Sequence, residues 1–177
     1  RKHPVKTMNS EQFQQQILPV IQAFSPEPLS VNFESTPVTV SLPPALLLPV
    51  VTEMKRHPEL YIDQLSCVTG IDNGAAAGTM EVMYHFYSIV NHFSLAVRVE
   101  LPYAALEVPT LTNHFGGANW LEREVYDMFG IVFTGHPDLR RILMPADWEG
   151  FPLRKDYREQ ERYHGLELHP DPNASAT

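Results

Sequence analysis

Apolar and polar residues alternate most regularly in the middle of the chain. From Phe93 to Leu101 every second residue is a large apolar one, while Arg98 and Glu100 fall on the opposite side. A period of two predicts half-buried strands, here Phe93–Leu101 and its neighbour Thr79–Ile89. Shorter stretches of the same kind predict three further strands, at Leu29–Glu34, Pro37–Leu42 and Tyr61–Ile71.

Helical spacing occurs before and after these strands. Residues 10–24 carry Phe13, Ile17 and Ile21 on one stripe, and Pro19 predicts a kink or two short helical pieces. Pro43-Pro44 predicts the start of a second helix that ends near His57, with its regular part delayed by Pro49. We therefore expect an α+β fold, in which helices cover one face of a mostly antiparallel sheet and an extended C-terminal arm follows.

The strongest helix signal lies between Asn119 and Gly130. Asn119 and Glu122 have capping-box spacing, so we expect Glu122 to bond the helix start. Leu121, Val125, Met128 and Phe129 form an apolar stripe, and Gly130 stands where a left-handed C-cap residue belongs. Arg123 and Asp127 are four residues apart, which predicts an ion pair on the outer face of the helix.

After this helix the sequence predicts an arm with little regular structure. Gly135-His136-Pro137 turns the chain, and Asp138 is predicted to cap one helical turn over Leu139–Leu143. Aromatic residues then alternate with cationic ones, which is typical of protein interfaces. We divide the chain into a flexible N-terminus (1–8), an α+β domain (9–130), an extended docking arm (131–158) and a disordered tail (159–177).

Charge and composition narrow the classes of partner. The 177 residues include 13 basic and 21 acidic ones, a net charge of −8 that argues against nucleic acid. Between Arg140 and Arg158, however, five basic residues face three acidic ones, so the arm is locally positive. The longest apolar run, Ala45–Val51, is far too short to span a bilayer, and the first residues lack the apolar core of a signal peptide. We expect a soluble, intracellular protein, and the missing initiator Met is consistent with a trimmed N-terminus.

Few residues suggest chemistry. Glu124 and Asp127 lie close enough on a helix to form an acid/base pair, which leaves a hydrolase as an alternative to a charged helix face. His136 has no second histidine at metal-ligand spacing, and we interpret it as a turn histidine. The single cysteine, Cys67, cannot hold an iron–sulfur cluster by itself. We expect no catalytic residue, no metal and no cofactor on this chain.

Three runs in the C-terminal half resemble a known family. They are Glu122–Ile131 (EREVYDMFGI), Gly135–Arg141 (GHPDLRR) and Asp147–Tyr157 (DWEGFPLRKDY). Together they closely resemble the 30-kDa-type subunit family of respiratory NADH:quinone oxidoreductase (complex I), also called the C subunit of that enzyme. Two positions depart from the family pattern, since Phe151 stands where a polar residue or histidine is usual and Arg158 where a proline often follows the tyrosine.

The resemblance implies a cofactor-free structural subunit in the hydrophilic arm of a proton-translocating enzyme. The implied partners are the subunit that is similar to the large chain of nickel–iron hydrogenases and the small subunit with the terminal iron–sulfur cluster. FMN and the clusters would lie on partner subunits. The implied location is peripheral, on the cytoplasmic side of the bacterial inner membrane (the matrix side in mitochondria), with membrane contact only through the complex.

Two alternatives stay open at this point. The first is the equivalent subunit of a membrane-bound hydrogenase or of a ferredoxin- or F420-linked complex. The second is an independent hydrolase that uses Glu124 and Asp127. On the complex I interpretation, the residues predicted to form the partner interface are Glu122, Arg123, Glu124, Asp127, His136, Arg140, Arg141, Trp148, Arg154, Lys155, Asp156 and Tyr157.

Overall fold

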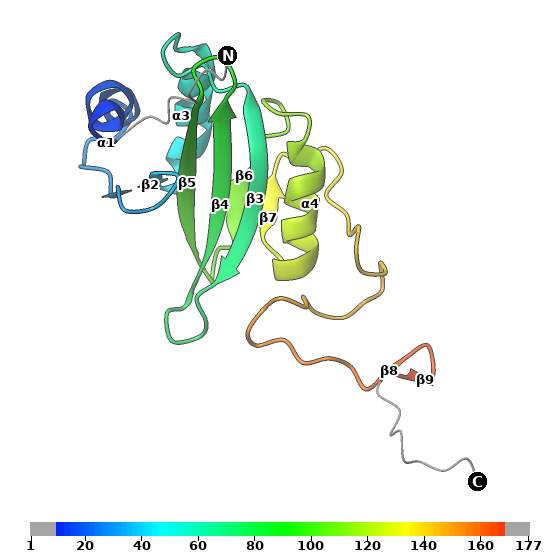
Figure 1. The fold of residues 1–177 in the computed structure, drawn as a ribbon. Coiled ribbons are helices and arrows are strands. Elements are labelled where there is room, and N and C mark those ends of the chain that lie inside the picture. The colour runs from blue at the N-terminus through cyan, green and yellow to red at the C-terminus, as the bar shows by residue number, and fades with distance from the viewer. Residues whose placement is uncertain (1–9, 169–177) are drawn as a thin grey trace, which may run out of the picture.

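The computed structural model describes residues 10–168, and a five-stranded sheet forms its centre (Figure 1). The strands lie in the order β1-β2-β5-β4-β3. All neighbours are antiparallel except β2 and β5, which are parallel. The expected α+β fold with a mostly antiparallel sheet is therefore confirmed. The strands are β1 (Val31–Asn32), β2 (Thr39–Ser41), β3 (Gln64–Asp72), β4 (Thr79–Ser88) and β5 (Phe93–Pro102).

The strongest alternation in the sequence corresponds to the longest pairing in the structure. Strands β4 and β5 pair without interruption from Thr79 opposite Pro102 to Ser88 opposite Phe93. Every second side chain of both strands is buried, as the period of two predicts. The strand β1 is much shorter than its prediction and keeps only two residues.

The helical stretches begin close to their expected positions. The first is α1 (Ser10–Gln12), a π-helical turn η1 (Phe13–Ile17) and α2 (Leu18–Gln22), with Pro19 near the start of α2. The second is α3 (Pro44–Arg56), which contains Pro49 and is already helical before it, so the prediction of a delayed start is wrong. Pro49 is the sixth residue of α3, so its missing N–H costs the helix one intrahelical bond, that to the carbonyl of Ala45. The third is α4 (Ala118–Phe129).

Helices α3 and α4 both pack against the inner face of the sheet, as expected (Figure 1). The apolar side chains of β4 and β5 form the core there, including Tyr84 and Val97, which are fully buried. At the β3 end, the ring of Phe129 lies over Gly70, where a Cβ atom would come within 2.5 Å of the ring. The glycine thus lets α4 approach the sheet closely.

A second, small parallel pair connects the sheet domain with the arm. Strand β6 (Glu107–Pro109) pairs in parallel with β7 (Val132–Thr134), so β6, α4 and β7 form a β-α-β crossover. Because β7 falls within the predicted arm, the first part of residues 131–158 belongs to the folded body.

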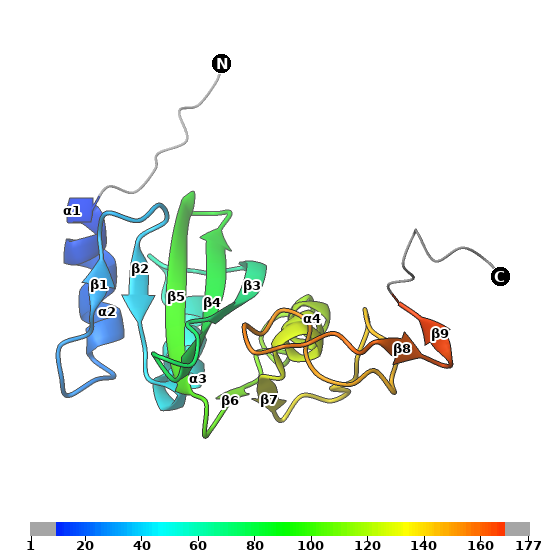
Figure 2. The same ribbon diagram turned by 90° about the horizontal axis from the view of Figure 1, so that it is seen from below.

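Beyond β7 the chain runs as an extended segment past α4, returns to the end of β3, where Lys155 bonds Asp72, and then continues away from the sheet to β8 (Figure 2). The predicted helical turn over Leu139–Leu143 is absent, since residues 139–141 have no regular structure and residues 142–144 form a bend. A short hairpin, β8 (Arg162–Tyr163) and β9 (Leu166–Glu167), occurs within the tail for which disorder is predicted. The flexible N-terminus predicted for residues 1–8 and the last residues of the tail lie outside the described part of the chain. No helix within residues 10–168 has the length and apolarity needed to cross a bilayer.

Candidate docking site

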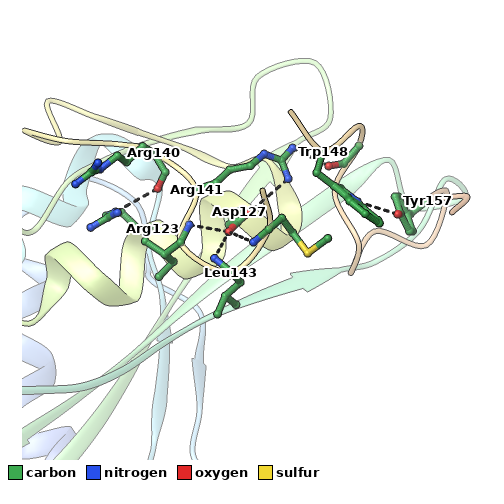
Figure 3. A network of polar contacts seen from close by, with 10 residues as sticks. Arg123, Asp127, Arg140, Arg141, Leu143, Trp148 and Tyr157 are labelled. Carbon is green, nitrogen blue, oxygen red and sulfur yellow. Dashed lines mark hydrogen bonds and ion pairs between the residues drawn. The ribbon is translucent and has the colours of Figure 1, made fainter. Parts of the chain in front are cut away.

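Asp127 fixes the first part of the arm. One of its carboxylate oxygens accepts hydrogen bonds from three successive backbone N–H groups, those of Ile142, Leu143 and Met144, at 2.8, 2.6 and 3.0 Å. The other accepts from the Arg141 guanidinium at 3.1 Å (Figure 3). The side chain of Asp127 is fully buried. A buried carboxylate that is satisfied in this way orients the donors around it, so α4 determines the path of the arm.

This arrangement corrects the prediction of an exposed Arg123–Asp127 pair. Both residues are buried, because the arm covers this side of α4. Asp127 pairs with Arg141 instead, across 14 positions of sequence. Helix spacing alone predicts the wrong partner, since it contains no information about a segment that returns over the helix. The predicted neighbour Glu124 is exposed.

Asp72, at the end of β3, fixes the second part of the arm. Its carboxylate accepts from the backbone N–H groups of Lys155 and Gly74, at 2.7 and 2.8 Å, and from the Tyr103 hydroxyl. Burial alone would raise the pKa of Asp72, but these three hydrogen bonds outweigh it and hold the pKa below its ordinary value. The N–H of Leu153 also donates to the carbonyl of Met128, which satisfies one free carbonyl at the end of α4.

An aromatic contact lies between the two anchors of the arm, Asp127 and Asp72. The ring of Phe151 lies against Gly130, which ends α4 in the left-handed conformation with φ +75°. The guanidinium groups of Arg141 and Arg154 lie 5.1 and 5.6 Å from the centre of that ring. Phe151 therefore packs between the end of the helix and two cations of the arm.

The hairpin β8–β9 closes over the Asp147–Trp148 loop. The indole N–H of Trp148 donates to the Tyr157 hydroxyl at 3.0 Å, and the Trp148 ring lies 5.2 Å from that of Tyr163. Hydrogen bonds from Tyr163 and His164 lower the pKa of Asp147. The aromatic residues that the sequence assigns to a partner interface thus also contact one another within the chain.

Glu122 does not cap α4. The N-cap residue is Gly117, without a side-chain bond, and Glu122 points inward and is fully buried. It accepts from the Thr110 hydroxyl at 2.5 Å and from the N–H of Leu111 at 2.6 Å. Burial raises the pKa of Glu122 to about 7, and the two hydrogen bonds only partly oppose this effect. The carboxylate connects α4 with the segment after β6 rather than with its own helix start.

His136 holds the turn at the start of the arm. Its Nδ1 accepts from the N–H of Asp138 at 3.0 Å, and its Nε2 lies 3.2 Å from the carbonyl oxygen of Asn119. A carbonyl only accepts, so Nε2 carries the proton and the ring is the neutral tautomer. This agrees with the interpretation of His136 as a turn residue.

The surface of the arm combines cationic and apolar side chains. Arg140 is largely exposed, and among residues 10–168 its side chain pairs only with Asp138, also exposed, at 3.0 Å. Leu143 and Leu153 are 59% and 56% exposed, although the backbone at both positions is fixed by the anchors. Lys155 and Asp156 are exposed as well. Of the predicted interface residues, Arg140, Lys155, Asp156 and Glu124 present their side chains to solvent, whereas Glu122 and Asp127 bond within the chain.

Neither the arm nor the sheet offers a site with obvious chemistry. An open depression of about 280 Å³ lies beside Phe151, Arg154 and Tyr157, and another of about 470 Å³ lies on the outer sheet face beside Glu81 and Arg98. Among the described residues, no three His, Cys, Asp or Glu side chains come together as a possible metal site.

Three residues that hold this region together, Asp72, Tyr103 and Thr110, are not predicted from the sequence. An Asp before Asn-Gly is typical of a turn, and that pattern accounts for Asp72 without any further role. Its second role depends on Lys155, 83 positions away, and no local pattern indicates that contact. Alternating strand patterns do show which face a residue occupies, and Asp72 continues the buried face of β3. An acidic residue on the buried face of a strand is the sequence signal that could have identified Asp72 as a contact of the arm.

Comparisons with known proteins identify related sequences. The profile of the family described as respiratory-chain NADH dehydrogenase, 30 kDa subunit, matches residues 40–163. The chain is 44% identical over 116 residues to the NADH-quinone oxidoreductase C subunit of Chloroherpeton thalassium, covering 65% of this chain and 48% of that protein. It is 42% identical over 142 residues to the corresponding C subunit of Roseiflexus castenholzii, covering 79% and 81%. The chain thus spans about half of the first relative and most of the second.

Two solved structures share the fold. A trypsin-resistant fragment (1–134) of Nqo5 superimposes with a TM-score of 0.59 at 29% identity, over 71% of this chain and 98% of the fragment. A chain of a membrane-bound sulfane sulfur reductase, an archaeal respiratory membrane complex, gives a TM-score of 0.68 at 21% identity, over 82% and 85%. At that identity the second likeness concerns the fold alone.

Proposed function

This chain belongs to the 30 kDa subunit family of the respiratory-chain NADH dehydrogenase, and from that premise we propose that it is a structural subunit of a proton-translocating NADH:quinone oxidoreductase. It would scaffold the quinone-reducing module in the hydrophilic arm, so that electrons pass from NADH through iron–sulfur clusters to quinone. Its own role is to hold partner subunits in position rather than to carry electrons.

The observation that carries this proposal is the fixed path of the arm. Asp127 and Asp72 hold its backbone through four N–H groups, while Arg140, Leu143 and Leu153 stay exposed. A segment that is already ordered loses little conformational entropy when it binds, so its exposed side chains contribute more fully to affinity. This is the arrangement expected of a preformed docking element.

The proposal includes the kind of partner. We infer that the arm contacts the subunit similar to the hydrogenase large chain and lies near the small subunit with the terminal cluster. The complex would place this chain on the cytoplasmic side of the bacterial inner membrane. FMN and iron–sulfur clusters would reside on partner subunits, because one cysteine cannot hold a cluster and the described residues form no metal site.

Purification from membranes tests the proposal. The chain is tagged at its C-terminus, extracted with a mild detergent, and analysed together with all proteins that accompany it. We expect flavin- and iron–sulfur-containing oxidoreductase subunits in fixed proportion. Recovery of the chain alone from intact membranes would contradict the proposal.

A related parent complex is the second candidate. The likeness to a chain of the sulfane sulfur reductase shows that this fold also occurs in another respiratory membrane complex. Assaying the purified complex with NADH, hydrogen and reduced ferredoxin as donors distinguishes the parents. Quinone reduction by NADH supports complex I, and activity only with another donor supports a relative.

The hydrolase alternative receives no support from the geometry. Asp127 is buried and bonded to four donors, while Glu124 is exposed, so the two carboxylates do not face a common substrate. For Glu124→Gln we expect unchanged NADH:quinone activity per bound flavin. An essential general acid or base would instead reduce that ratio by about 10²–10⁴-fold.

A further inference from the structure

Arg123 is a buried cation at the junction of α4 and the arm. The residue is only 5% exposed, and its Nε donates to the carbonyl of Arg140 at 3.2 Å. Its guanidinium carbon lies 4.8 Å from the centre of the Trp120 ring. The helix side chain is thus held between an exposed indole and the arm backbone.

No carboxylate neutralises this cation within the described chain. Among residues 10–168, Arg123 forms no ion pair, and its two terminal nitrogens donate no hydrogen bond. Both terminal nitrogens of Arg123 keep some contact with solvent, because neither is among the fully buried atoms that have no hydrogen-bond partner. Arg141, its neighbour at the same junction, has Asp127 at 3.1 Å. A largely buried guanidinium whose terminal nitrogens still reach the surface is favourably neutralised there by an anion from outside the chain.

The surroundings indicate what kind of anion fits. Trp120 is 63% exposed beside the guanidinium, and Trp and Arg are the residues that most often dominate protein interfaces. In Figure 3 the guanidinium groups of Arg123 and Arg140 both point away from Asp127. A guanidinium without an ion pair beside an exposed indole suits the carboxylate of a partner protein, whereas the net charge of −8 disfavours a polyphosphate chain.

We propose that Arg123 binds an Asp or Glu side chain of a partner subunit, with Trp120 packed beside the contact. This inference rests on the proposed function, because it assumes that the chain works within a complex. The inference adds what the partner must present, namely an acidic side chain that faces the surface formed by Trp120, Arg123 and Arg140. The partner's carboxylate would supply the anion that no residue between 10 and 168 provides at Arg123.

A zero-length cross-link tests the contact directly. Arg123→Lys keeps the charge and places a primary amine at this position, which a carbodiimide joins to an adjacent carboxylate. In the purified complex we expect an amide between position 123 and an Asp or Glu of another subunit, mapped by mass spectrometry. Arg162→Lys is the matched control, because Arg162 pairs with Glu167 of this chain at 2.8 Å and should give only an internal link.

One outcome overturns the inference and leaves the proposed function intact. If the Arg123→Lys complex assembles and position 123 gives no link, or only an internal one, Arg123 has no partner carboxylate. If the chain never accompanies other subunits, the proposed function fails as well. The two failures are therefore distinguishable by the composition of the purified material.

A second variant covers the case in which Arg123→Lys does not assemble. Arg123→Met removes the charge at similar length, and Arg141→Met serves as control because it leaves Asp127 without its cation. We expect Arg123→Met to lower the melting temperature of the isolated chain by less than half as much as Arg141→Met does. We also expect Arg123→Met to reduce recovery of the chain in the purified complex tenfold or more. If Arg123→Met lowers the melting temperature as much as Arg141→Met, or if it is fully recovered in the complex, Arg123 stabilises the folded chain and does not bind a partner.

Discussion

Asp127 acts on the arm through its charge, because it accepts four hydrogen bonds while fully buried. An amide has only one accepting oxygen and would direct N–H groups against N–H groups. We therefore expect Asp127→Asn to destabilise the isolated chain by about 2–4 kcal/mol. Urea unfolding measures this difference, and limited proteolysis should show faster cleavage near residues 142–144.

Glu124→Gln is the control for that experiment. Glu124 lies on the same helix and is exposed, so its neutral variant should stay within about 0.5 kcal/mol of the parent. Equal losses for the two variants would mean that the charge of the helix, rather than the anchor of the arm, determines stability.

Glu122 makes the stability of the fold depend on pH. Burial raises its pKa from 4.5 to about 7, so the folded chain keeps a proton that the unfolded chain releases. Stability from this group is complete below pH 4.5 and is lost as pH rises through about 7. Glu122→Gln lacks this loss, and its amide can donate to the Thr110 oxygen while its carbonyl accepts from Leu111.

We expect Glu122→Gln to gain ~3 kcal/mol relative to the parent on going from acid to mildly basic pH. Urea unfolding of both chains at a series of pH values measures the change. A difference that does not vary with pH would show that the carboxylate ionises as easily in the folded chain as in the unfolded one.

At the scale of elements, the end of α4 and the arm depend on one glycine. Gly130 has φ +75°, and a Cβ atom there would lie 2.6 Å from the Phe151 ring. We expect Gly130→Ala to lower stability by at least about 1 kcal/mol through the left-handed backbone, and further because the ring must move. Thermal unfolding measures the loss, and near-ultraviolet circular dichroism reports the displaced aromatic ring.

Gly117→Ala provides the comparison for this variant. Gly117 has an ordinary helical backbone, with φ −67°, and a Cβ atom added there would meet no other atom within 4 Å. It should change stability by no more than about 0.5 kcal/mol. Similar losses at both positions would rule out the contact with Phe151 as the cause.

Periodic elements could be predicted from the sequence, and contacts between distant segments could not. Strands β4 and β5 follow from alternation, and the C-cap at Gly130 follows from its position after an apolar stripe. The partner of Asp127 depends on how the arm returns over α4, and that path is determined by tertiary contacts. Tertiary packing also explains why the capping prediction for Glu122 is wrong. A capping residue and a buried residue that bonds another segment can both be a carboxylate early in a helix, and only packing distinguishes them.

At the scale of the whole molecule, the arm and the hairpin after it should contribute unequally. A chain that ends after Tyr157 loses β8–β9 but keeps the Phe151 contact and the Lys155–Asp72 bond. A chain that ends before Trp148 loses both, together with the Leu153–Met128 bond. We expect the first to assemble nearly as well as the parent and the second to lose about 2–4 kcal/mol of stability and most of its assembly.

Recovery in the purified complex and melting of the isolated chains measure these effects. If both shortened chains assemble equally well, residues 148–157 are not part of the docking element. If the first already fails, the hairpin over Asp147 and Trp148 carries more of the contact than its few bonds indicate.

The bond from Lys155 to Asp72 also has a consequence for how the protein is made. It joins residues 83 positions apart, whereas the bonds to Asp127 span 14 to 17. During synthesis on the ribosome, Met144 leaves the exit tunnel before Lys155, so the anchor at Asp127 can form before the anchor at Asp72. A nascent or prematurely terminated chain therefore cannot present the finished surface, and assembly selects for chains whose translation has passed Lys155.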